Sequence, residues 1–191
     1  MTTRITSRLA ALGAALAVGS AGLVAVSPSA QAAVSGKADY TCQTSFGPQV
    51  VTVTTKAPLP KKVKKGKKVP AKTVVLKVVL SPELATALRG FGITSLSGNA
   101  AGAKATVGKT KVALKNVAFK DQAVPASGAM TIKASGKTAA FKLRKRGTQV
   151  VKAPTKFKFS AQDQNGNALI SNASCSLNPG ENAKIGKIKV R

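Results

Sequence analysis

The cationic side chains are the residues of this chain most able to take part in chemistry. Residues 61–68 carry six lysines among eight positions, flanked by Pro58, Pro60 and Pro70, in a chain of formal net charge +26. Crowded lysines repel one another, and an acidic partner relieves the repulsion and releases counterions. We therefore expect a polyanion-binding surface. A plain solvated loop, whose lysines only keep the protein in solution, is the alternative interpretation.

Two further segments share this cationic character. Residues 142–158 hold an Arg-Lys-Arg triplet, and residues 184–191 end the chain with alternating lysines. Lysines that alternate with apolar residues are also typical of the solvent-facing side of a strand. The candidate polyanion-binding residues are Lys61, Lys62, Lys64, Lys65, Lys67, Lys68, Arg144, Lys145 and Arg146.

Enzymatic chemistry is poorly supported by the remaining residue types. The chain has no histidine, which removes imidazole bases, Ser-His triads and most zinc sites. Its five acidic residues are scattered, although a hydrolase that uses a pair such as Asp121 and Asp163 would need them only about 5–10 Å apart after folding. We expect no enzyme, no cofactor and no metal site.

The two cysteines, Cys42 and Cys175, lie near the two ends of the chain that remains after residue 32. In an oxidising compartment they are expected to form a structural disulfide, with two free thiols or an intermolecular bridge as alternatives. The first 32 residues predict export, since Arg4 and Arg8 precede an apolar run that leads to the A-x-A cleavage site at residues 30–32. A retained membrane anchor is the alternative.

Residues 33–191 are expected to form a single domain that carries 29 Lys and Arg against five acidic residues, or +24. Within it no apolar run is long enough to span a bilayer, because the longest, residues 74–80, is short and holds Lys77. The protein is therefore expected to be secreted and to associate with the cell wall.

Short alternating runs separated by Gly, Pro, Asn and Ser predict an all-β domain. We expect an immunoglobulin-like β-sandwich of about 8–10 strands, with one short helix at residues 82–89 that follows an Ser-Pro-Glu start signal. In one predicted strand the apolar positions switch from even to odd residue numbers, which predicts a bulge near Asn116. Hairpins are expected around residues 135–137 and at the Asn165-Gly166 pair.

The conformation of the lysine segment is open between two alternatives. A polyproline II helix would place Pro60, Val63, Gly66 and Val69 along one edge and the lysines along the other two. A turn at Gly66 that joins two short strand ends is the competing prediction. Either conformation fixes the cations on the domain surface.

Several short motifs resemble those of a known group of proteins. They are Tyr40-Thr41-Cys42, residues 63–69 around Gly66, the passage 80–84 that runs on to Gly90 and Gly98, and Cys175-Ser176-Leu177 with Pro179. In these the chain resembles secreted proteins of high-GC Gram-positive bacteria (actinomycetes) that carry a β-sandwich-like domain of unknown function. The resemblance favours the turn at Gly66 and implies no catalytic residues.

These observations predict a secreted, non-enzymatic β-sandwich that associates electrostatically with acidic cell-wall polymers or other anionic surfaces. Nucleic acid is a weaker candidate, because one Tyr, six Phe and no Trp leave few side chains to stack on bases. The alternative, from another class, is a structural or protein-interaction module whose charge serves solubility. The sequence does not predict the oligomeric state.

Overall fold

The computed structural model describes residues 31–191, which form fourteen strands and one helix. The predicted signal peptide, residues 1–32, lies outside these residues except for its last two, which begin the first strand. No helix in residues 31–191 is long and apolar enough to cross a membrane. The elements are β1 (Gln31–Thr44), β2 (Gly47–Pro60), β3 (Lys62–Val63), β4 (Lys68–Val69), β5 (Thr73–Leu80), α1 (Pro82–Gly90), β6 (Ser95–Ala101), β7 (Lys104–Val107), β8 (Thr110–Ala123), β9 (Met130–Thr138), β10 (Phe141–Lys142), β11 (Gly147–Lys152), β12 (Lys156–Gln162), β13 (Ala168–Leu177) and β14 (Lys184–Val190).

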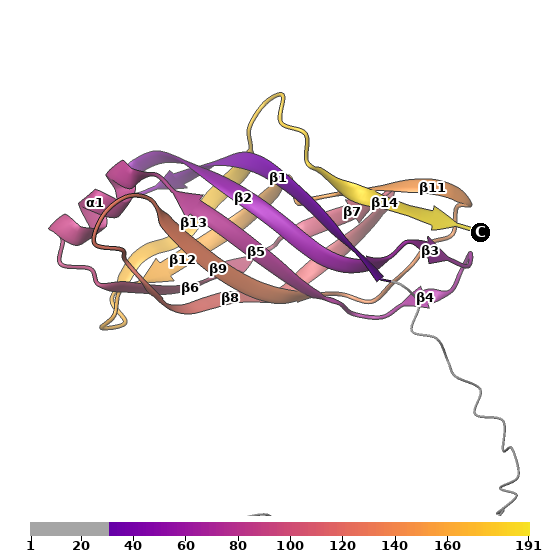
Figure 1. Cartoon of the computed structure of the whole chain (residues 1–191), viewed down its shortest axis with the longest axis horizontal. Coiled ribbons are helices and arrows are strands. Elements are labelled where there is room, and N and C mark those ends of the chain that lie inside the picture. The colour runs from indigo at the N-terminus through magenta and orange to yellow at the C-terminus, as the bar shows by residue number, and fades with distance from the viewer. Residues whose placement is uncertain (1–30) are drawn as a thin grey trace, which may run out of the picture.

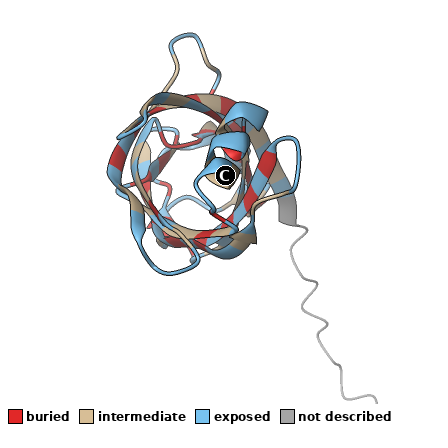
Figure 2. Ribbon diagram, turned by 90° about the vertical axis from the view of Figure 1, so that its left-hand side faces the viewer, coloured by how far each residue is buried: buried red, intermediate tan, exposed pale blue. Residues whose placement is uncertain are grey.

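Eight of the strands close into an antiparallel barrel, in the order β8-β6-β12-β13-β1-β2-β5-β9, and β9 returns to β8. Viewed from the end that carries α1, their ribbons form a ring (Figure 2). The all-β class and the short helix are thus confirmed, whereas the immunoglobulin-like sandwich is wrong. A sandwich strand and a barrel strand both bury one face, so the alternation in the sequence is the same for the two folds.

The ring closes where β8 bends. Asn116 adopts a left-handed conformation with φ 52°, and the β8–β9 register shifts between Lys115 and Ala118. This irregularity is the predicted bulge, and it lets Leu114 and Val117 both face inward. The first half of β8 pairs with β7, and its second half pairs with β6.

The predicted hairpin at residues 135–137 is wrong, because β9 runs straight through Gly136. A Cβ atom at this position would lie 2.7 Å from Val117 Cγ2 and 3.0 Å from the Lys115 carbonyl oxygen. Gly136 is therefore needed for the close approach of β9 to β8 and makes no turn. By contrast, the predicted turn at Asn165-Gly166 is confirmed between β12 and β13.

The strands outside the ring gather at the end of the barrel opposite α1 (Figure 1). There β7, β11, β14 and β3 continue the sheet from the first half of β8, and β4 pairs with β10. Buried side chains from these strands and from Leu143, which follows β10, fill this end; they include Val69, Phe141, Ile188 and Val190.

Helix α1 lies at the other end. The Ser81 hydroxyl accepts a hydrogen bond from Leu84 N, Pro82 occupies the first turn, and Ala85 is fully buried. The segment after the helix is hydrogen-bonded to the β12–β13 loop through Gln164. The side chain of Gln164 accepts a hydrogen bond from Thr94 N and donates one to Gly92 O. Several loops are thus joined around one opening of the barrel.

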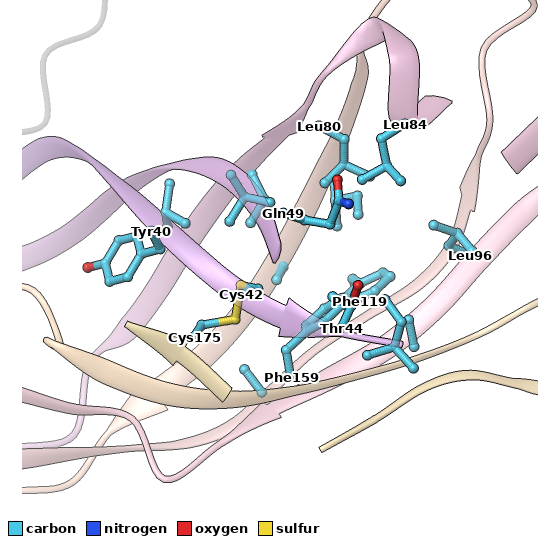
Figure 3. A pocket seen from close by; sticks show the side chains of 18 of the residues that line it. Tyr40, Cys42, Thr44, Gln49, Leu80, Leu84, Leu96, Phe119, Phe159 and Cys175 are labelled. Carbon is cyan, nitrogen blue, oxygen red and sulfur yellow. A yellow bond between two sulfur atoms is a disulfide. The ribbon is translucent and has the colours of Figure 1, made fainter. Parts of the chain in front are cut away.

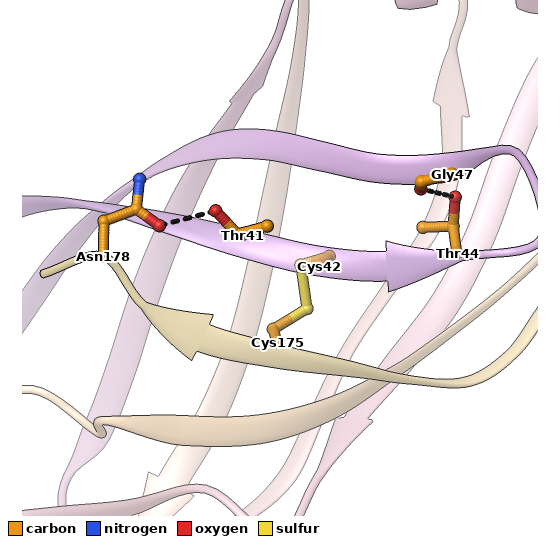
Figure 4. The surroundings of a disulfide bond; sticks show 6 residues. All are labelled: Thr41, Cys42, Thr44, Gly47, Cys175 and Asn178. Carbon is orange, nitrogen blue, oxygen red and sulfur yellow. Dashed lines mark hydrogen bonds between the residues drawn. A yellow bond between two sulfur atoms is a disulfide. The ribbon is translucent and has the colours of Figure 1, made fainter.

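A disulfide between Cys42 and Cys175 links β1 to β13, where the two residues are directly opposite (Figure 4). Beside it the Thr41 hydroxyl donates to Asn178 Oδ1 at 2.7 Å, and the Thr44 hydroxyl donates to Gly47 O at 2.8 Å. The intramolecular bridge expected from the sequence is confirmed. It joins strands 133 positions apart and forms part of the barrel wall near α1.

Candidate functional site

The α1 half of the barrel encloses an apolar cavity of about 570 Å³ (Figure 3). All eight barrel strands and α1 contribute to its wall. One lining residue from each of β1, β2, β5, β6, β8, β9, β12, β13 and α1, in that order, is Tyr40, Val51, Leu76, Leu96, Leu114, Ile132, Phe157, Ile170 and Leu84. Native interiors hold few voids larger than one water molecule, so a space of this size requires an explanation. Its volume falls in the range of about 300–1,000 Å³ that is usual for small-molecule sites.

Small inward-facing side chains keep the cavity open. Ala100, Ala134 and Ala161 occupy inward positions on β6, β9 and β12, where larger residues would meet across the ring. Phe119 and Phe159 stack with ring centroids 6.0 Å apart and line one side of the cavity. The space therefore follows from the inward side chains themselves.

Tyr40 is a buried residue of the cavity wall. Its hydroxyl donates to Pro154 O at 2.7 Å, and its ring packs edge-on against Phe157 at 5.3 Å. Burial, and secondly the Glu181 carboxylate, raises the pKa of Tyr40 to about 12. No buried side-chain N or O atom in residues 31–191 lacks a hydrogen-bond partner. The inner wall therefore requires no hydrogen bond from a bound molecule.

The cavity reaches the surface at a rim that we call the mouth, formed by residues 44–49, 81–95 and 162–168. Phe46 and Phe91 line the cavity there and are 54% and 70% exposed, with ring centroids 6.2 Å apart. Thr44 and Gln49 add neutral polar groups just inside. An apolar molecule entering at this point would meet aromatic rings first.

The charged groups at the mouth are acidic. Glu83 in the first turn of α1 and Asp163 in the β12–β13 turn both line the cavity. The pKa of Glu83 is lowered mainly by a hydrogen bond with its own backbone N–H, and secondly by one with the Ser81 hydroxyl. The pKa of Asp163 is lowered mainly by the Asn167 side chain, which donates to its carboxylate at 2.9 Å. Both groups are therefore anionic at neutral pH.

The nine predicted polyanion-binding residues are brought together at the opposite end, which we call the basic end and define as residues 61–68, 142–146 and 184–191. Lys189 N donates to Lys61 O, Arg191 N to Val63 O, and Lys65 N to Arg191 O, so the first and last segments lie side by side. Gly66 N donates to Leu143 O at 2.8 Å and joins the middle segment to them. Backbone hydrogen bonds thus hold all three segments together.

The cations of the basic end all lie on its outer surface. The three segments carry six, four and four Lys or Arg side chains, and every one of these side chains is exposed. None of the three segments contains an acidic residue. The chain turns at Gly66, with φ 75°, between the short strands β3 and β4. The turn at Gly66 is therefore confirmed, and the polyproline II alternative is wrong.

The acid pair considered for a hydrolase is engaged in local structure. The Asp163 carboxylate accepts hydrogen bonds from Asn165 N, Asn167 N and Asn167 Nδ2 in its own turn. Asp121 accepts from the Ser97 hydroxyl across the β6–β8 pair. Each carboxylate stabilises its own turn or strand pair.

The cavity was missed in the sequence. Alternation identifies which side chains face inward, but the void depends on which strands face one another across the ring. One signal was present, namely the alanines and polar residues at inward positions in the α1 half, including Thr44 and Gln49. The basic end contrasts with this, since its residues are recognisable by charge alone.

Comparison with known proteins places the chain in one family. No curated protein matches it, and no solved structure does. A family model matches residues 39–186, which include seven of the barrel strands entirely, the last six residues of β1, the residues of the cavity and much of the basic end. The chain therefore belongs to the family of unknown function DUF6801.

Proposed function

We propose that the protein binds an apolar small molecule, such as a single alkyl or isoprenoid chain, inside the barrel. The observation that carries this proposal is the 570 Å³ apolar cavity that opens between two exposed phenylalanines. Each buried methylene of a ligand contributes roughly 0.8 kcal/mol, so a chain of moderate length gains enough to bind. The rigid ring of strands provides a preformed site, which keeps the entropic cost of binding low.

A fluorescence titration with N-phenyl-1-naphthylamine, a neutral apolar dye, tests the proposal. The dye is expected to brighten on binding with 1:1 stoichiometry. In Ala134→Phe a ring projects into the cavity, and dye binding should fall at least about tenfold. Ala118→Phe is the matched control, because Ala118 is exposed on the outside of β8. Equal dye binding by the two variants would contradict a site inside the barrel.

A second function is supported by a separate observation. Three segments far apart in sequence meet in the basic end, and their cations are all exposed. We propose that this surface associates with anionic polymers such as those of the cell wall. The mechanism is multivalent contact of Lys and Arg with phosphate or carboxylate groups, driven by counterion release. Low stereochemical specificity follows, because lysines bind as flexible point charges.

Binding to immobilised poly-L-glutamate at increasing salt tests this second proposal. Affinity should fall steeply between about 50 mM and 200 mM salt. Changing the six lysines of residues 61–68 to Gln should weaken binding about a hundredfold. The matched control removes the same charge from the barrel wall by changing Lys37, Lys77, Lys120, Lys133, Lys156 and Lys158 to Gln. If both variants lose affinity equally, the charge serves solubility or a general field rather than a defined site.

Both functions fit a protein that is exported. The disulfide between Cys42 and Cys175 supports an oxidising compartment, and the first 32 residues have the pattern of a cleaved leader. We therefore propose secretion, with retention at the wall through the basic end. N-terminal sequencing of the protein recovered from culture medium and from washed cell walls tests this proposal.

A further inference from the structure

The wall of the cavity differs in charge from the rest of the chain. Of the 31 Lys and Arg residues in the sequence, none lines the cavity in the part of the chain that the structure describes. Two of the five acidic residues do, Glu83 and Asp163, and both lie at the mouth. The site of a strongly cationic protein is therefore neutral inside and anionic at its entrance.

The inner wall offers no charge partner to a ligand. Tyr40 is its one ionisable side chain, and the hydroxyl is already bonded to Pro154 O. Polar groups without a partner are absent among the buried side chains of residues 31–191. An ionised head group taken into this space would lose its water without compensation. A charged end of a ligand must therefore stay at the mouth.

At the mouth, the anionic groups determine which charge is tolerated. Glu83 projects from the first turn of α1, and the carboxylate of Asp163 faces its own turn, so Glu83 is the less constrained of the two. Arg89, the cation of α1, is directed elsewhere, since its guanidinium donates to Pro125 O at 2.8 Å and to Thr86 Oγ1 at 2.6 Å. Gln49 offers a neutral amide that can both donate and accept a hydrogen bond.

The cations of the basic end act too far away to reverse this preference. Strand β2 runs 14 residues from Gly47 at the mouth to Pro60 beside the basic end. At about 3.3 Å per residue, the two ends lie roughly 40 Å apart along the strand. This separation is several times the Debye length of about 8 Å at physiological ionic strength. Salt therefore screens the mouth from the basic end.

We infer that the cavity selects amphiphiles with an uncharged or cationic head group, such as alkyl or isoprenoid alcohols, amines and neutral esters, and discriminates against carboxylates, sulfates and phosphates. The inference rests on the proposed function, because it specifies the ligand class of the same cavity. It runs against the net charge of the protein, which by itself would favour anionic ligands.

Competition for the dye by a series of equal chain length tests the inference. Decylamine, 1-decanol and decanoate share their apolar part, so differences in displacement of N-phenyl-1-naphthylamine report the head group. In 0.15 M salt we expect decylamine and decanol to compete about threefold to fivefold better than decanoate, because the exposed carboxylates at the mouth repel its anionic head group. If the dye binds but decanoate competes as well as decanol or better, the inference is overturned and the proposed function stands.

Failure of the dye and of all three competitors to bind would instead overturn the proposed function, and the inference with it. Variants of Glu83 identify the group responsible. Glu83→Gln should reduce the preference for the amine over the carboxylate about threefold, and Glu83→Lys should reduce it further or reverse it. Glu83→Asp should retain it. The matched control, Glu181→Gln, removes an acid outside the mouth and should change nothing. Melting temperatures show whether each variant is folded, and equal preferences in folded Glu83→Lys and Glu181→Gln would assign no role to Glu83.

Discussion

The two ends of the barrel differ in both packing and charge. At the mouth, aromatic rings surround an apolar space of about 570 Å³, and the charged lining residues are acidic. Toward the basic end, the interior is filled, and the cavity there has a volume of only about 20 Å³. Its outer surface carries the exposed cations of three segments. Strands β1 and β2 run through both halves, so they form one continuous wall.

This difference indicates how one barrel can hold two separate binding surfaces. A filled interior with charge outside suits contact with a large anionic polymer, while a hollow interior with little charge suits a small apolar ligand. The barrel wall in the α1 half is cross-linked by a disulfide, whereas the basic end is held by backbone hydrogen bonds such as Gly66 N to Leu143 O. We therefore expect the two halves to differ in stability as well.

The largest effect is expected from removal of the disulfide. Replacing Cys42 and Cys175 together by Ala should lower the free energy of unfolding by roughly 4–5 kcal/mol, because the bridge closes a loop of 133 positions. Urea unfolding measures the loss. Hydrogen exchange should show that amides of β1 and β13 near the mouth lose more protection than those of β14. Uniform loss along the barrel would contradict a difference between the halves.

Truncation of one leucine in each half should show the difference in packing. Leu143→Ala, in the filled half, is expected to lower the free energy of unfolding by about 3 kcal/mol, since it leaves a new void. Leu76→Ala, on the cavity wall, should cost only about 1 kcal/mol, because the side chain already borders empty space. Chemical denaturation compares the pair. A larger cost for Leu76→Ala would mean that the cavity is not open in solution.

Tyr40, buried in the wall of the cavity, should give stability a pH dependence. Its pKa is raised to about 12 by burial, above the value near 10 of an exposed tyrosine. The unfolded chain therefore releases this proton first, and stability is lost as the pH rises from about 10 to 12. The loss should reach roughly 2 kcal/mol. Tyr40→Phe should lack this component, so the difference between the stability profiles of the two proteins above pH 9 is the measurement. Parallel profiles would contradict the buried hydroxyl.

The smallest effect concerns the loops at the mouth. Gln164→Ala removes two hydrogen bonds to the segment that follows α1, at Gly92 O and Thr94 N. These bonds are exposed, so we expect a loss of about 0.5–1 kcal/mol. Hydrogen exchange should rise at residues 91–95 and stay unchanged at the basic end. An equal rise at both ends would show that the loops do not act locally.

Local structure was largely predictable from the sequence. The Ser81-Pro82-Glu83 start of the helix, the turn at residues 165–166 and the bulge at Asn116 depend on local rules and were found where predicted. Closure of the ring depends on the pairing of β8 with β9, which inward alternation does not specify. The same long-range pairing creates the cavity, so the barrel and its site were missed together.

The basic end was predictable in its residues but not in its assembly. Charge density marked residues 61–68 in the sequence, whereas the pairing of Lys62 with Lys189 in parallel strands has no local signal. Pairing of Lys68 with Lys142 likewise joins segments more than 70 positions apart. Like charges on neighbouring strands repel, so this arrangement depends on the backbone hydrogen bonds between the segments and on buried residues such as Val69 and Phe141.

The most direct test is a titration of N-phenyl-1-naphthylamine in the presence and absence of saturating poly-L-glutamate, at 0.15 M salt. We predict one dye site per protein, with an affinity that changes less than twofold when the polyanion occupies the basic end. Absence of a saturable dye site, or displacement of the dye by the polyanion, would contradict the existence of two separate sites at the two ends of the barrel.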